Sequence, residues 1–147
     1  AVLFLSQAET HETIRAFFPP GTRSPLHASG IGKALLAHMR AFELRQLMRE
    51  MQLAQFTPMT LSAPQALLDD LAQLRPRGYS LDNEERSLGM RCIAAPIFDL
   101  AGEAAAGISV SGPLSRMGDA RLQAMSECVI TAARELSFGM VKRAEDG

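Results

Sequence analysis

The feature that constrains this fold most is a pair of strand-like segments, residues 91–98 and 104–111, separated by the short turn 99–102. Two β-prone runs on either side of a short turn predict an antiparallel hairpin. A third β-prone run, residues 79–84, precedes them and is expected to pair alongside. The sequence therefore predicts three adjacent antiparallel strands.

Three further segments carry the signals of helices. Ser29 is expected to cap a helix that begins at Gly30, and apolar residues at helical spacing predict a second helix over residues 41–52. Residues 62–65, Ser-Ala-Pro-Gln, predict a capping box that opens a third helix. Because proline disrupts a helix interior, this helix is expected to end near Pro76.

A long amphipathic helix is expected to close the chain, with Asp119 as its cap. Its apolar stripe comprises Leu122, Met125, Val129, Ala133, Leu136 and Met140. Two β-rich runs, residues 2–8 and 13–18, precede all the helices. This order of elements favours an α+β fold in which the helices form a layer on one side of an antiparallel sheet.

The start of the chain predicts a hairpin followed by a loop. The runs 2–8 and 13–18 are separated by a polar stretch and are expected to pair. Residues 19–25 contain three prolines and a glycine, so we expect irregular structure there. The sequence opens directly into a strand without an initiator Met, which suggests a fragment of a longer protein.

Composition narrows the class of protein. Fifteen Lys and Arg against sixteen Asp and Glu give a net charge of −1, so this piece lacks the basic surface that holds nucleic acid. Cys92 and Cys128 lack paired spacing, which is typical of free thiols in the cytoplasm. The histidines and Cys92 lack metal-ligand spacing, and no apolar run reaches membrane-spanning length. We therefore expect a cytoplasmic protein without metal or cofactor.

Small side chains gather on one face of two neighbouring predicted strands. Ala105, Gly107, Ser109 and Ser111 alternate along the last strand, and Cys92 and Ala94 share a face of the strand before it. Such a face leaves a shallow space above the sheet. Either a helix packs closely there or the space is a ligand pocket, and the pattern alone favours the helix.

A glycine-rich helix entry, residues 27–33, is the second feature with chemical potential. Free backbone N–H groups and the helix dipole at such an entry suit a carboxylate or another anion. The spacing does not match a nucleotide-binding loop. For this motif taken alone, capping of the helix by Ser29 without any ligand is the better explanation.

Three blocks of the sequence, residues 26–36, 77–85 and 89–99 with its continuation through 106–113, together resemble the effector-binding domain of the isocitrate lyase regulator (IclR) family of bacterial transcriptional regulators. The resemblance implies a curved antiparallel sheet with helices packed on it, in the GAF/profilin-like class of sensor folds. It also implies that residues 1–147 form one effector-binding domain, without its first helix and strand and without the family's N-terminal winged helix-turn-helix. DNA would be bound only through that N-terminal domain.

The resemblance further implies a pocket for a small organic or aromatic acid and assembly into homodimers or homotetramers. The effector-binding residues that it places on this sequence are Ser24, Gly30, Ile31, Asp82, Cys92, Ser109 and Ser111. Ile31 departs from relatives with the smallest effectors, which often carry Ala there. The bulk of Ile31 is therefore expected to alter the depth of the pocket.

The expected chemistry follows from charge. An effector carboxylate would accept hydrogen bonds from the backbone N–H groups of Gly30 and Ile31 and from the two serine hydroxyls. Asp82 would face a hydroxyl, a hydrated carbonyl or an amide, or would be held protonated. Cys92 would form a small wall. Two alternatives are a dimerisation module without ligand and an enzyme that uses Cys92 as nucleophile with His27 and Asp82.

Overall fold

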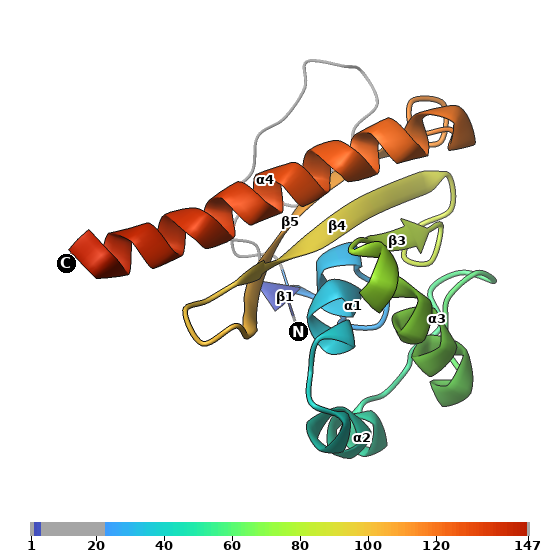
Figure 1. The fold of residues 1–147 in the computed structure, drawn as a ribbon. Helices are drawn as coiled ribbons and strands as arrows, with labels where there is room; N and C mark the ends of the chain where they lie inside the picture. Colours follow the sequence, from blue (N-terminus) through green and yellow to red (C-terminus); the bar gives the residue numbers. More distant parts are fainter. Residues whose placement is uncertain (1, 4–22, 147) are drawn as a thin grey trace.

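The three predicted strands form one antiparallel sheet in the computed structural model, which describes residues 2–3 and 23–146 (Figure 1). The strands are β3 (Ser80–Asn83), β4 (Met90–Phe98) and β5 (Ala104–Pro113), in the order β3-β4-β5. The sheet and the helices around it confirm the α+β class.

Helices cover both faces of this sheet, so the prediction of a helix layer on one side is wrong. Figure 1 shows α4 (Asp119–Asp146) crossing one face, while α1 (Gly30–Ala37) lies on the other, next to α3 (Pro64–Arg77). The reason lies in β4, where both faces are apolar or small. Residues 93–97 of this strand are buried without interruption.

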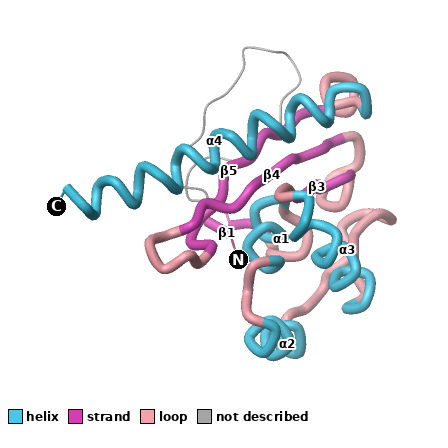
Figure 2. Tube along the Cα trace, viewed as in Figure 1, coloured by secondary structure: helices cyan, strands magenta, loops and turns pink. Residues whose placement is uncertain are grey.

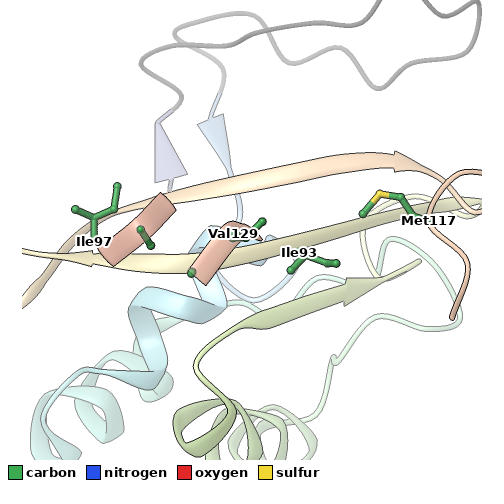
Figure 3. Packing of buried hydrophobic residues seen from close by; sticks show 6 residues of the cluster. Ile93, Ile97, Met117 and Val129 are labelled. Carbon is green, nitrogen blue, oxygen red and sulfur yellow. The ribbon is translucent and has the colours of Figure 1, made fainter. Parts of the chain in front are cut away.

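The main core lies between β4 and α4. Ile93, Ile97 and Met117 pack with Val129 and Ala133 of α4 (Figure 3). The expected apolar stripe of α4 is only partly correct. Leu136, a member of the stripe, is 47% exposed, whereas Ile130, which is not a member, packs against the core. Helix α4 runs beyond the edge of the sheet, so its last turns have no strand beneath them (Figure 1).

A second apolar cluster lies on the α1 side and joins α1, α3 and α2 (Ala41–Glu50) through Leu36 and three leucines of α3. The expected capping box of α3 does not form. Ala63 is the N-cap residue and makes no side-chain cap bond, and Gln65 instead donates to Asp69. Pro64 occupies the first turn, where a missing N–H costs nothing.

A short antiparallel pair joins the two described parts of the chain near its start. β1 (Val2–Leu3) pairs with β2 (Arg23–Ser24). The expectation that residues 19–25 are irregular throughout is therefore wrong for Arg23 and Ser24, which are not prolines and keep their N–H groups for pairing. The segment 13–18, the expected partner of 2–8, lies outside the described residues.

Between the elements from β2 onwards, the longest connection is the loop between α2 and α3, residues 51–63 (Figure 2). Two threonines dock this loop onto the turn after β3, because Thr57 Oγ1 donates to Glu84 O at 2.6 Å and Thr60 Oγ1 donates to Glu85 O at 2.5 Å. Across the part of the chain that the structure describes, none of the helices combines the length and the apolar character that crossing a membrane requires.

Candidate functional site

The site begins with two rows of side chains that run across the sheet. Strand register places Cys92 of β4 between Asp82 of β3 and Ser111 of β5. The next row contains Ser80, Ala94 and Ser109 in the same order. Alternate residues of a strand share one face, so both rows lie on the α1 side of the sheet.

Helix α1 approaches this face at its N-terminus, where Gly30 leaves room. A Cβ atom on Gly30 would lie 2.8 Å from Cys92 Sγ and 3.1 Å from Ala94 Cβ. The Ser80 hydroxyl, fully buried, donates to Gly30 O and ties the helix to the sheet. The absence of a side chain at Gly30 therefore lets the helix end stand directly above Cys92.

The first N–H groups of α1 have no carbonyl within the helix to accept them. Ser29 satisfies one of them, because its Oγ accepts a hydrogen bond from Gly32 N at 3.2 Å. The Gly30 and Ile31 N–H groups precede the turn that Ser29 closes. This helix end therefore carries partial positive charge beside the row of Asp82, Cys92 and Ser111.

A pocket opens between this helix end and the sheet. It encloses about 490 Å³, open solvent at its mouth included. The lining residues come from β2 and the loop after it, from the turn between β3 and β4, and from the sheet face: Ser24, Ala28, Ser29, Gly30, Asp82, Arg86, Ser87, Met90, Arg91, Cys92 and Ser111.

Five of the seven residues expected to bind an effector line this pocket, namely Ser24, Gly30, Asp82, Cys92 and Ser111. Ser109 lies deeper, within hydrogen-bonding reach of Cys92. Ile31 does not line the pocket; its side chain packs on β5, where a Cβ on Gly107 would lie 2.7 Å from Ile31 Cγ2. This contact directs the Ile31 side chain towards Gly107, and the expectation that its bulk alters the depth of the pocket stays a prediction.

The two interpretations of the small sheet face both apply, at different ends of it. At Gly107 and Ala94, helix α1 packs closely on the sheet. At Cys92 and Ser111, beside the N-terminal residue Gly30 of the helix, the pocket opens. Ser29 likewise caps the helix and lines the pocket.

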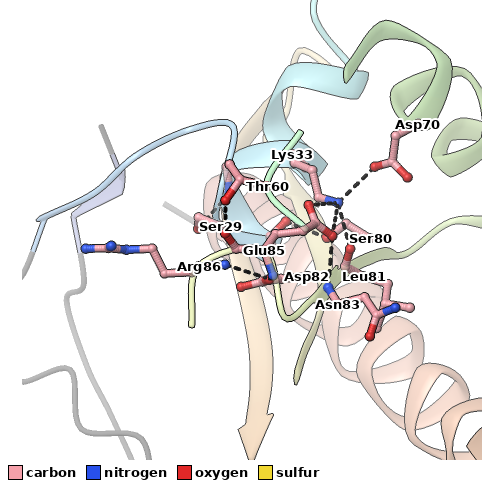
Figure 4. Close-up of polar contacts among 12 residues, drawn as sticks. Ser29, Lys33, Thr60, Asp70, Ser80, Leu81, Asp82, Asn83, Glu85 and Arg86 are labelled. Carbon is pink, nitrogen blue, oxygen red and sulfur yellow. Dashed lines mark hydrogen bonds and ion pairs between the residues drawn. The ribbon is translucent and has the colours of Figure 1, made fainter. Parts of the chain in front are cut away.

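Asp82 is buried at the pocket, 9% exposed. Its Oδ1 accepts hydrogen bonds from Glu85 N at 2.9 Å and Arg86 N at 3.3 Å (Figure 4). Burial, with repulsion from Glu85, raises the pKa of Asp82 from 3.8 to about 6. Near neutral pH this carboxyl group is therefore mostly ionised, with a protonated fraction far larger than an ordinary aspartate would have.

Lys33 stabilises the segment around Asp82 through contacts with neighbouring residues. Its ammonium group is fully buried and lies 2.9 Å from Asp70 Oδ2, 2.8 Å from Glu85 Oε1 and 2.6 Å from Leu81 O. Glu85 Oε2 also accepts a hydrogen bond from Asn83 N at 2.9 Å. The turn that carries Asp82 is therefore fixed by a lysine of α1, one helical turn beyond Gly30 (Figure 4).

The sequence does not indicate this support, because a run of charged residues such as 82–86 usually forms a solvated turn. In the structure Asp82 and Glu85 are both buried. One signal was present: Lys33 is the single charged residue of α1 and lies among buried small and apolar positions of that helix. A lysine in such a place needs an acidic partner elsewhere in the fold.

Cys92 is a partly buried free thiol at the centre of the site. Burial raises its pKa and the charge of Asp82 raises it further, against hydrogen bonds from Ser111, Ser109 and the Gly30 backbone. A nucleophilic cysteine requires the opposite, a pKa lowered by its surroundings. The side chain of His27 also points elsewhere, since its Nε2 lies 2.8 Å from Ala54 O. The geometry therefore does not support the alternative of a Cys92 enzyme.

Replacing Asp82 by asparagine is expected to stabilise the ligand-free protein at pH 7.5 by about 1 to 3 kcal/mol. Because the folded state raises the pKa of Asp82 to about 6, it holds the proton more tightly than the unfolded chain. This stabilising contribution is complete below about pH 4 and is lost as pH rises through 6. Urea unfolding of both proteins between pH 4 and 8 should therefore give a difference that grows with pH; a constant difference would contradict this assignment.

The chain is similar to known bacterial transcriptional regulators along its length. The family model described as "Bacterial transcriptional regulator IclR C-terminal" matches residues 1–138. The HTH-type transcriptional regulator BhcR of Paracoccus denitrificans is 76% identical over 147 residues, which cover 100% of this chain and 53% of that protein. The chain spans about half the length of the curated relatives it matches.

Solved structures agree with the sequence matches. The Thermotoga maritima IclR structure superposes with a TM-score of 0.90 at 30% identity, covering 94% of this chain and 56% of that one. The inducer-binding domain of PobR from Acinetobacter, a double mutant in complex with 3-hydroxybenzoic acid, gives a TM-score of 0.74 at 27% identity. That match covers 80% of this chain and 70% of the PobR domain.

Proposed function

Because the chain belongs to the IclR family of bacterial transcriptional regulators and corresponds to their C-terminal domain, we propose that it is an effector-binding domain that takes a small organic or aromatic acid into the pocket beside Gly30. The observation that carries this proposal is that one pocket is lined by the N-terminus of α1, by serine hydroxyls and by Asp82, a carboxyl group with a raised pKa. The inducer complex of the PobR domain supports the same ligand class.

The helix end supplies the donors for the effector's carboxylate. The N–H groups of Gly30 and Ile31 would donate to one carboxylate oxygen, and the hydroxyls of Ser109 and Ser111 to the other. Hydrogen bonds to a charged acceptor contribute about 1.5 to 3 kcal/mol each, and the helix dipole about 0.3 to 1 kcal/mol. Ser24 and Cys92 would close the sides of the site.

Asp82 would contact the opposite end of the effector. An ionised carboxyl group repels a carboxylate, so Asp82 would accept a hydrogen bond from a hydroxyl group or, when protonated, donate one to a carbonyl. Its raised pKa allows both states near neutral pH. The preferred effector therefore carries a hydroxyl or carbonyl group besides its acid group.

Regulation requires that the effector bind one arrangement of the whole protein more tightly than another. We propose that the intact regulator is a homodimer or homotetramer in the bacterial cytoplasm, without a bound cofactor or metal. Its DNA contacts would come from a winged helix-turn-helix domain preceding this one. Effector binding would change how the paired DNA-binding domains are spaced on an operator.

The experiment that tests this proposal is thermal unfolding with pyruvate, lactate and 3-hydroxybenzoate. An acid present at 100 times its Kd stabilises the protein by about 2.7 kcal/mol, which raises Tm by about 5 to 10 °C for a domain of this size. The double variant Ser109→Ala, Ser111→Ala should weaken binding at least about tenfold, because two donors are lost.

Ser115→Ala, an exposed serine after β5, is the matched control and should bind like the wild type. Absence of a Tm increase with every acid would reject the proposal in favour of a dimerisation module without ligand. Equal affinity of the double variant and the wild type would reject the assigned hydroxyl contacts.

A further inference from the structure

Two arginines line the pocket, and among the described residues only the guanidinium group of Arg91 has hydrogen-bond and ion-pair partners. Arg91 donates to Asn83 Oδ1 at 2.8 Å and to Met117 O at 3.0 Å, and it forms an ion pair with Asp119 at 2.7 Å. Protein acceptors therefore already occupy the guanidinium group of Arg91, which makes it less available to a ligand.

Arg86 is in the opposite situation. Within the described residues no carboxylate lies at ion-pair distance from its guanidinium group, and its buried Nε has no hydrogen-bond partner there. Its side chain extends away from the Asp82 carboxyl group (Figure 4). A buried donor without an acceptor costs free energy. The Nε–H group of Arg86 can therefore gain a hydrogen bond from a ligand that brings an acceptor.

The position of Arg86 is nevertheless fixed. Its backbone N–H is bound by Asp82, and its guanidinium carbon lies 4.1 Å from the centre of the Phe56 ring, a cation–π contact. The Phe56 ring in turn stacks on the His27 ring, with 5.8 Å between the ring centres. An arginine held in this way loses little side-chain entropy when it binds an anion.

Several acidic groups lie near the pocket, and the charge of Arg86 would offset their repulsion of an acidic ligand. Glu85 and Asp70 both form ion pairs with one buried cation, Lys33, and Asp82 lies close enough to Glu85 to be repelled by it. In this cluster around Lys33 the acidic groups therefore outnumber the basic ones. Without a further positive charge, their repulsion would oppose the entry of a carboxylate.

We infer that Arg86 determines the charge selectivity of this pocket, with its guanidinium group as the counter-charge that makes the site bind an organic acid in preference to its neutral analogue. The inference rests on the proposed function and extends it from backbone and hydroxyl donors to a specific cation. It assigns Arg86 as a specificity-determining residue and Phe56 as the residue that positions it.

The test compares each acid with its amide, which has nearly the same shape without the charge. Kd values are measured by calorimetry for pyruvate and pyruvamide, lactate and lactamide, and 3-hydroxybenzoate and 3-hydroxybenzamide. The wild type should prefer the acid at least about tenfold. Arg86→Met should lose most of this preference through weaker acid binding, with amide binding nearly unchanged. Arg86→Lys should keep most of it, because the charge is retained.

Arg45→Met, which removes the same charge from the exposed face of α2, is the matched control and should keep the preference. An unchanged acid-to-amide ratio in folded Arg86→Met would overturn the inference while the proposed function stands. Failure of the wild type to bind any of the acids would overturn both. Ligand-free Tm values of all variants identify any loss of folding.

Discussion

Lys33→Met is expected to destabilise the domain by about 3 to 5 kcal/mol, because it removes the cation from a buried cluster of charges and leaves the acids behind. For a domain of this size the loss lowers Tm by roughly 10 °C or more. Methionine keeps most of the volume of the lysine side chain. The expected loss is therefore electrostatic and does not come from a cavity.

The cost arises mainly at Glu85, which is 5% exposed. Without Lys33 its carboxylate would keep one backbone hydrogen bond, from Asn83 N, and would have no counter-charge. Asp70 contributes less, since its side chain is 25% exposed and can be hydrated. Leu81 O also loses a donor at 2.6 Å. Each of these groups holds the turn that positions Asp82.

A double variant separates charge from packing. Lys33→Met combined with Glu85→Gln should recover a large part of the lost stability, because the glutamine side chain is neutral and its oxygen can still accept from Asn83 N. Urea unfolding of the wild type, both single variants and the double variant gives the coupling between the two residues. A double variant whose loss equals the sum of the single losses would contradict a direct Lys33–Glu85 interaction.

The sheet and its small face were predictable because strand signals are local. Alternation along residues 104–111 and the turn 99–102 predict a register in which small residues share a face, and the structure places Cys92 opposite Ser111. Five expected site residues then line one pocket. For Cys92 and Ser111 the shared face followed from alternation, and Gly30 belonged to the glycine-rich helix entry, whereas only the family resemblance selected Ser24 and Asp82.

The charged support of the site was not predictable, because its partners are far apart in the sequence. Lys33 and Glu85 are 52 residues apart, and no local pattern relates them. A run of acidic and basic residues such as 82–86 is usually solvated, so its burial becomes evident only when α1 and the α2–α3 loop pack on it. Similarly, Leu136 continues the predicted apolar stripe of α4 but its side chain is exposed, although the next residue, Ser137, contacts the end of β4.

Gly32→Ala is expected to be the second strongly destabilising change, at about 3 kcal/mol or more. A Cβ atom at this position would lie 2.3 Å from Leu26 O and 2.7 Å from Leu26 Cα. These are backbone atoms, so the clash cannot be relieved by rotating a side chain. The segment 26–29 would have to move away from α1, and the small gain in helix propensity from alanine, up to about 1 kcal/mol, does not compensate.

Gly139→Ala in α4 is the matched control, since a Cβ at Gly139 meets no atom within 4 Å. It should stabilise the protein by about 0.5 to 1 kcal/mol, because alanine favours the helix. The same substitution thus has opposite signs in two helices, and thermal unfolding of both variants measures this directly. Because segment 26–29 carries Ala28 and Ser29 of the pocket wall, Gly32→Ala should also weaken acid binding, whereas Gly139→Ala should not. Similar stability of the two variants would show that the helix entry is not packed against Leu26 as described.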